Sequence, residues 1–161
     1  MTSDELTAIE ARNEDETALV LRTCHADMTS YDGFVWPEVG PVECPDWDPI
    51  PKCGSGLHGW LWGEGNGSLG IWEDDARWLV CRVLAADVVD LVGKVKFPRA
   101  WVEFCGDRYA ATQYLLHHGG QGRAVVGSTL TGGVCSTLTG GDRATLTGGD
   151  RATLTGGDRA T

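Results

Sequence analysis

The chain has 161 residues and a formal net charge of −10 at pH 7. This acidic balance, with no basic stripe to offset it, argues against nucleic acids and anionic membranes as partners. The sequence also lacks any run of about 18 apolar residues, so it predicts no transmembrane span.

The composition changes near residue 119. All seven tryptophans precede that position, whereas 12 of the 23 glycines lie at or beyond it. Acidic residues outnumber basic ones by 20 to 9 before the change, and the remainder of the chain is nearly neutral. We therefore expect a globular domain over residues 1–118, a junction over 119–127 and a repeat region over 128–161.

The first 16 residues predict a short helix, because Thr2 and Glu5 have the spacing of a capping box. The segment has neither the basic start nor the apolar stretch of a secretory signal. We therefore expect synthesis in the cytoplasm, with surface or extracellular exposure by another route left open. Free thiols are accordingly the expected state of the six cysteines.

The rest of the first 118 residues predicts a small α+β domain with a curved, mainly antiparallel sheet. Apolar and alternating runs predict strands over residues 18–24 and 77–83. Two more strands are predicted over 94–97 and 101–104, separated by a proline. Residues 106–118 predict a helix capped by Asp107. The region between, residues 31–75, is rich in Pro, Gly and Trp and is expected to be mostly loop.

The stretch from Cys44 to Gly67 holds the densest set of polar candidates. Cys44, Cys53 and His58 allow a zinc site, although their spacing is not that of a tight zinc knuckle. Structural thiols and a hydrogen-bonded histidine are the preferred interpretation, and no cofactor is expected. The tryptophans are assigned to the core or to a domain interface, with a carbohydrate or nucleotide platform as the alternative.

From Ser128 onward the chain repeats every eight residues, with two successive copies of ATLTGGDR over 144–151 and 152–159. The first half of each octad alternates small, polar, apolar and polar residues, which is the pattern of a strand. The inward side is then expected to hold Leu130, Leu138, Leu146, Leu154, Ala144 and Ala152. The outward side is expected to hold the threonine pairs Thr129/Thr131, Thr137/Thr139, Thr145/Thr147 and Thr153/Thr155.

The second half of each octad predicts a corner in which glycines take positive φ and the aspartate bonds its own backbone. Two octads placed back to back form a flat coil of 16 residues, and such coils stack roughly every 4.8 Å. A calcium-binding array would need nine residues per repeat, whereas a disordered Gly/Thr-rich linker stays open as an alternative. Stacking would place charged residues in columns at the corners, namely Asp142, Arg143, Asp150, Arg151, Asp158 and Arg159.

These Thr-x-Thr strands and Gly-rich corners resemble the repeats of bacterial ice-nucleation proteins, over about residues 128–161. The resemblance implies a β-solenoid whose threonine pairs order water. The Gly-Tyr-Gly corners of that family are missing, since no tyrosine follows Tyr114. The Gly-Asp-Arg corners are instead similar to the arginine-bearing coils at the end of such arrays, which are linked to self-assembly.

The first domain is similar to uncharacterised bacterial modules with a Gly-Leu-His core that precede short-period repeats. It also faintly resembles ADP-ribosyltransferases, through Arg22 on a first strand and the Gly-Leu-His turn of residues 56–58. In that interpretation these groups hold NAD and Glu103 acts as the acid, although the Ser-Thr-Ser strand motif is missing. The preferred interpretation pairs Arg22 with a local carboxylate and lets His58 cap a turn.

The sequence therefore predicts a structural, non-enzymatic protein whose first domain caps the start of a water-ordering β-solenoid. Its expected partners are the water or ice surface and further copies of the chain, joined through solenoid ends or edges. Two coils offer little area, so we expect the chain by itself to nucleate ice poorly. The halt inside an octad predicts that the array belongs to a longer protein. A catalytic front domain on a stalk and an inert fibre or spacer stay as alternatives.

Overall fold

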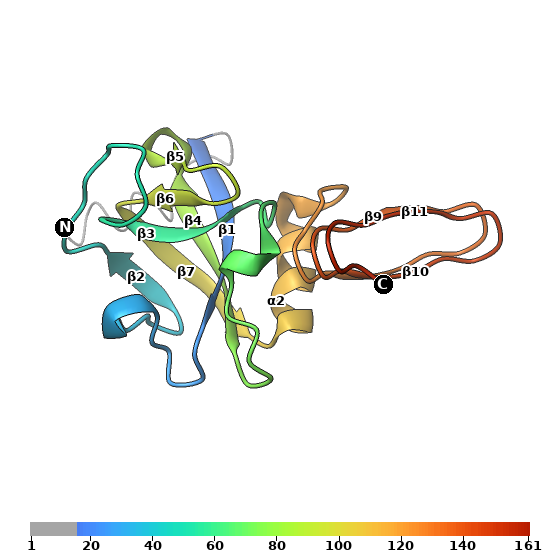
Figure 1. Cartoon of the computed structure of the whole chain (residues 1–161), viewed down its shortest axis with the longest axis horizontal. Coiled ribbons are helices and arrows are strands. Elements are labelled where there is room, and N and C mark those ends of the chain that lie inside the picture. Colours follow the sequence, from blue (N-terminus) through green and yellow to red (C-terminus); the bar gives the residue numbers. More distant parts are fainter. Residues whose placement is uncertain (1–15) are drawn as a thin grey trace.

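The computed structural model describes residues 16–161, so the helix predicted over the first 16 residues lies almost entirely outside the described residues. The described part is mostly β-structure with one short α-helix (Figure 1). A sheet and helix α2 form one end of the molecule, which we call the front domain. The repeat region, residues 128–161, extends from it as a flat ring. No helix within the described residues has the length and apolar composition needed to cross a bilayer.

The front domain is built on an antiparallel sheet that the described residues form from seven strands, in the order β2-β7-β4-β1-β3-β6-β5. The long strands β4, β1 and β7 lie together, and the shorter ones flank them. The strands are β1 Thr17–Cys24, β2 Gly40–Glu43, β3 Leu57–Leu61, β4 Arg77–Leu84, β5 Val89–Asp90, β6 Val95–Phe97 and β7 Arg99–Gly106.

The sheet separates two apolar cores, because β1 is buried on both faces. Ala18 and Val20 of β1 belong to one core, with Trp36 and Phe97. Leu19 and Leu21 belong to the other, beside α2 (Arg108–Leu115). A continuous apolar run suits such a central strand, since neither of its faces meets water.

The four strands and the helix predicted from the sequence are present, and each observed end lies within three residues of the predicted one. Asp107 caps α2, because its carboxylate accepts the backbone N–H of Ala110 at 2.7 Å. A π-type turn over Leu116–Gly120 follows α2. Residues 31–75 are mostly loop, as expected, and they also contribute the short strands β2 and β3, which were not predicted. Glycine at position 59 allows β3 to approach β1, because a Cβ there would overlap Val20 and lie 2.8 Å from the backbone oxygen of Leu21.

The repeat region contains four short strands, β8 Thr129–Thr131, β9 Thr137–Thr139, β10 Thr145–Thr147 and β11 Thr153–Thr155. β10 pairs with β8 and β11 pairs with β9, both in parallel. In each pair every residue lies beside the residue 16 positions earlier, for example Leu146 beside Leu130. In Figure 1 the labelled strands β9 and β11 run along one side of the ring and β10 along the other.

The corners of the ring differ from the sequence-based prediction. The residue with positive φ is the eighth of each octad, with φ of 60° at Cys135 and 55° at Arg143, and not a glycine. The glycine pairs instead allow neighbouring side chains and backbone to lie close to the corners. A Cβ at Gly140 would lie 2.5 Å from the Cβ of Ala144, and one at Gly141 would lie 2.7 Å from the backbone of Val125. Small residues are therefore required by the tight corner and by the segment stacked against it.

The segment Val125–Gly127 joins the two parts of the molecule. Val125 and Val126 are fully buried in the core beside α2. The same segment pairs with a corner 16 residues later, since Gly141 N–H donates to the Val125 carbonyl at 2.9 Å and Gly127 N–H donates to the Asp142 carbonyl at 2.8 Å. Three residues assigned to the junction from sequence thus lie in the front-domain core and in the stacked ladder.

This stacking predicts that two glycines at the same octad position respond differently to alanine. Gly141→Ala is expected to destabilise the first coil by about 2 kcal/mol, because the new Cβ meets backbone that cannot move away. Gly133→Ala is the matched control, since its Cβ would meet nothing within 4 Å. Amide hydrogen exchange at Arg143 and Gly157, followed by NMR, measures the local opening. Equal exchange in the two variants would contradict the stacking.

Candidate functional site

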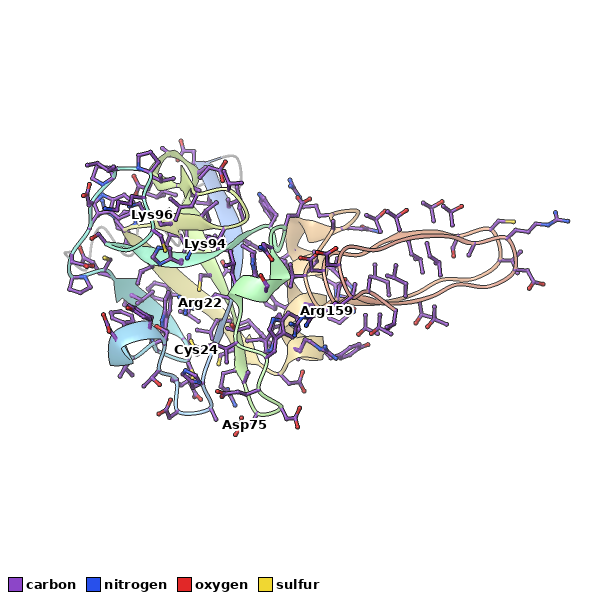
Figure 2. All side chains as sticks on the ribbon, viewed as in Figure 1. Arg22, Cys24, Asp75, Lys94, Lys96 and Arg159 are labelled. Carbon is purple, nitrogen blue, oxygen red and sulfur yellow. The ribbon has the colours of Figure 1, made fainter. Side chains whose placement is uncertain are left out.

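The threonine pairs of the four repeat strands form the main candidate surface. Pairing in register places Thr145 beside Thr129 and Thr147 beside Thr131 on one side, and Thr153 beside Thr137 and Thr155 beside Thr139 on the other. Of these eight threonines, six are exposed, and the two half-buried ones are Thr129 and Thr139. Figure 2 shows side chains with terminal oxygens on the outside of the ring.

The hydroxyl groups of this surface are free to bind water. Within residues 16–161, none of the eight threonine hydroxyls forms a hydrogen bond with another protein group. Neighbouring threonines of one strand lie roughly 6.8 Å apart, and equivalent threonines of paired strands lie roughly 4.8 Å apart. The geometry is a small, regular lattice of hydroxyls and methyls.

The leucines lie on the opposite side of each strand, toward the inside of the ring. A Cβ on Gly140 would lie 3.0 Å from Cδ2 of Leu146, and one on Gly132 would lie 3.1 Å from Cδ2 of Leu138. Burial is graded along the region, from the fully buried Ala144 through the half-buried Leu130, Leu138, Leu146 and Ala152 to Leu154, which is 46% exposed. The interior is thus best covered next to the front domain.

The charged corner residues fall into two classes. Asp142 and Arg143 contact the front domain: Asp142 Oδ2 accepts Gly67 N–H at 2.8 Å, and the Arg143 guanidinium lies 4.4 Å from the ring centre of Trp72. Asp142 Oδ1 also accepts the backbone N–H of Asp158 at 2.8 Å, which connects successive coils. The remaining corner residues are exposed, namely Asp150, Arg151, Asp158 and Arg159.

Helix α2 covers part of the first repeat strand, a contact that sequence reasoning missed. Gln113 Nε2 donates to the Thr129 carbonyl at 3.0 Å, which satisfies a backbone acceptor at the edge of β8. The buried Ser128 completes the turn into this strand, because its hydroxyl donates to the Val125 carbonyl at 2.9 Å. A sequence signal for this anchor existed in the apolar run Ala124–Val126 between Gly-rich segments.

The zinc candidates in the front domain each have a different partner. Cys44 Sγ donates to Asp46 at 3.0 Å, Cys53 Sγ accepts from Lys94 at 3.1 Å, and His58 Nε2 accepts Gly54 N–H at 3.4 Å. Burial raises the pKa of the Cys44 thiol to about 11, which disfavours the thiolate that a metal needs. No group of three His, Cys, Asp or Glu side chains suited to a metal occurs within residues 16–161. All six cysteines lie in that range as free thiols.

The structure does not bring together the residues of the ADP-ribosyltransferase interpretation. Arg22 lies 3.9 Å from the ring centre of Trp36, in one core, and donates to the His58 carbonyl at 3.0 Å. Glu103 instead pairs with Arg82 and accepts the hydroxyl of Tyr114 at 2.9 Å, beside α2. The expectation that Arg22 pairs with a carboxylate is therefore wrong, because backbone carbonyls and an aromatic ring surround it. The proposed turn contact of His58 is present.

The double contact of Asp142 predicts a large effect of its removal. Asp142→Ala leaves two backbone N–H groups without their acceptor and is expected to reduce protection of the Gly67 and Asp158 amides by about 2 kcal/mol. Asp150→Ala is the matched control, because the Asp150 carboxylate forms no hydrogen bond within the described residues. Hydrogen exchange measures both changes. The assignment of these contacts fails if the Gly67 and Asp158 amides are equally protected from exchange in the two variants.

A second prediction concerns pH. Burial, followed by the charges of Lys94, Arg22 and Lys96, lowers the pKa of His58 from 6.5 to about 4, and Asp46 opposes this. As pH falls, His58 therefore binds its proton at a higher pH in the unfolded chain than in the folded chain. Its contribution to the free energy of unfolding is present above pH 6.5 and is lost as pH falls toward 4.

Urea unfolding measured from pH 7 to pH 4 tests this shift. The free energy of unfolding of wild type should fall by about 2 kcal/mol more over that range than that of His58→Gln. This figure includes a reduction for the partial exposure of the ring. His117→Gln, at an exposed position on the turn after α2, is the control and should keep the wild-type profile. Parallel profiles for wild type and His58→Gln would refute the shift.

Several curated proteins are similar to this chain. An ice nucleation protein of Pseudomonas fluorescens is 44% identical over 104 residues, which is 63% of this chain and 9% of the relative. One from Pseudomonas syringae pv. syringae is 41% identical over 118 residues, 72% of this chain and 10% of the relative. Ice nucleation protein InaU of Pantoea ananas is 39% identical over 107 residues, 65% of this chain and 10% of the relative.

The matched segments lie in the N-terminal two thirds of the chain, outside most of the repeat region that suggested the resemblance. They amount to about a tenth of the length of these relatives. No solved structure matches the chain. Residues 18–117, which run from β1 through α2, match a family model that covers more than half of the chain. The chain therefore belongs to the family described as Domain of unknown function (DUF7666).

Proposed function

We propose that the repeat region is the first part of a β-solenoid whose threonine faces order water, and that the front domain anchors its start. The observation that carries this proposal is the 16-residue register of the parallel strand pairs. Such a register places identical residues above one another, so each added coil extends the same surface. A disordered linker would have no reason to keep this pairing.

The chemistry of the faces supports contact with ordered water. Each face offers hydroxyls without protein partners, held at fixed spacings by the backbone ladder. Threonine is stiff at χ1, so its hydroxyl and methyl keep their positions with little loss of entropy when water binds. A rigid array of this kind is suited to hold a layer of water in a lattice.

The names of the relatives support a role in ice nucleation, because the similarity links the front domain to proteins with that name. The role proposed for this chain is structural and non-enzymatic. Arg22 contacts Trp36 of one core, whereas Glu103 bonds Tyr114 beside the other core, so the residues weighed for catalysis do not form one site. In this proposal the front domain fixes the first coil.

The small surface area of the two coils limits how well this chain alone can nucleate ice. Two stacked coils cover about 1 nm along the stacking direction, which is small for a template of ice. Within the described residues β11 pairs on one side only, so its other edge offers backbone groups to a further coil of the same chain or of another copy. We propose that activity depends on such extension.

Freezing of supercooled droplets tests the proposal. The chain is lengthened by whole 16-residue coils of its own sequence, in steps that double the array. The freezing temperature is expected to rise with each doubling, because a larger ordered surface stabilises a larger ice nucleus. Droplets that contain the chain of 161 residues should freeze at a temperature only slightly above that of droplets of buffer alone.

Replacing both threonines of every strand by valine in the longest array is expected to abolish most of this rise. Valine keeps the shape and the strand preference but removes the hydroxyl. The matched control replaces the exposed corner pair Asp150 and Arg151 by Asn and Gln, and circular dichroism verifies folding of each array. A valine array that nucleates as well as the control would indicate an inert spacer.

A further inference from the structure

A small pocket opens in the front domain, away from the threonine faces. Its lining includes the polar side chains of Arg22 on β1, His58 on β3 and Lys94, and the apolar side chains of Trp60 and Leu69. The space is about 350 Å³ including the open mouth. Figure 2 labels Arg22, Lys94 and Lys96 in this part of the front domain.

The pocket is cationic in a domain that is acidic overall. No aspartate or glutamate lines it. Arg22, Lys94 and Lys96 form no ion pair with a carboxylate among residues 16–161, although five other ion pairs occur there. Buried cations are normally paired, so the described part of the chain leaves the positive charge of this cluster without a counter-charge.

Arg22 shows the imbalance most clearly. Its Nη1 and Nη2 donate to the carbonyls of His58 and Thr23 at 3.0 and 3.1 Å, and its Nε is buried without a partner. A guanidinium has five N–H donors, so donors are left over after these two bonds. Carbonyls and the ring of Trp36 fix the group in place but do not neutralise it.

The two lysines add to the same field. Lys96 is 1% exposed, and its Nζ donates to the Lys52 carbonyl at 2.9 Å. Lys94 lines the pocket, and its Nζ donates to the Cys53 sulfur at 3.1 Å. The depressed pKa of His58 has burial as its main cause, and Lys94, Arg22 and Lys96 lower it further. The pocket thus presents a positive potential to anything that enters.

We propose that this pocket binds a phosphate group, either free inorganic phosphate or the terminal phosphate of a small ester. Two lining cations with no lining carboxylate match a ligand that carries close to two negative charges, as phosphate esters do at neutral pH. Arginine and lysine are the side chains that recognise phosphate most often. The small volume admits the phosphoryl group, and the wall of Trp60 and Leu69 suits the carbon atoms that follow it.

NMR titration of the whole chain with inorganic phosphate tests the site. Bound phosphate is expected to raise the pKa of His58 toward its ordinary value, because an anion offsets the charges of Arg22, Lys94 and Lys96. The melting temperature should rise with phosphate concentration, since phosphate binds the folded state. Sodium chloride at matched ionic strength is the reference. No phosphate-dependent change in either measurement at about 100 mM, where even weak binding is visible, overturns the proposal.

Lys94→Gln should weaken phosphate binding about tenfold or more, because it removes one charged donor at the partly exposed side of the pocket. Arg151→Gln is the matched control, since it removes one positive charge from an exposed corner in the repeat region. Arg22→Gln should remove binding, provided that its circular dichroism spectrum is that of wild type. Equal affinity in wild type and Lys94→Gln contradicts the assignment of the pocket.

Two further arms distinguish the source of the phosphate. Glucose 6-phosphate that binds more tightly than inorganic phosphate indicates an ester, and equal or weaker binding indicates the free ion. Acetate tests whether any anion binds in the same way. If acetate raises the pKa of His58 as strongly as phosphate does, the phosphate assignment is overturned. Freezing activity plays no part in these measurements, so their outcome is independent of the proposed role of the threonine faces.

Discussion

The structure depends on one short segment, Val125–Gly127, that belongs to two packing systems at once. Its valines are buried against α2 and the sheet, and its backbone pairs with the corner at Gly141 and Asp142. Isolated repeat coils have few apolar contacts of their own, and in this structure the first coil stacks against a segment that is held in the front-domain core. The repeat strands continue from this attachment in a constant register, with each residue of β10 and β11 beside the residue 16 positions earlier.

The gradient of burial agrees with that dependence. Ala144 is fully buried near the front domain, whereas Leu154 is 46% exposed at the far side of the stack. Each coil shields the apolar side chains of its neighbours, so the outermost coil in any such array is the least protected. Asp142 strengthens the first step, since a single carboxylate accepts N–H groups from the front domain and from the next coil. This carboxylate thus connects the front domain with both coils of the repeat region.

The front domain also separates two sets of polar groups. Glu103, Arg82 and Tyr114 form a closed network beside α2, and burial together with the hydrogen bond to Glu103 raises the pKa of Tyr114 to about 12. These charges balance within the network, so it serves packing. Arg22 on β1 and the lysines beyond β3, on the other side of β1, have no such balance among residues 16–161. The physical difference between the two clusters is the presence of a carboxylate, and it separates a structural network from a candidate binding site.

Local patterns in the sequence determined the octad period, the strand alternation, the cap at Asp107 and the strands that became β1, β4, β6 and β7. These features depend on residues that are close in sequence, so periodicity and side-chain preference are sufficient to predict them. Strands β2 and β3 were not predicted from local patterns, because a Gly- and Pro-rich segment becomes a strand only when a neighbour such as β1 supplies hydrogen-bond partners. Only the tertiary structure decided the partners of Arg22, the contact of Asp142 with Gly67 and the role of the corner glycines. Each of these depends on groups that are distant in sequence, and no local pattern states which distant backbone will lie within a few ångströms.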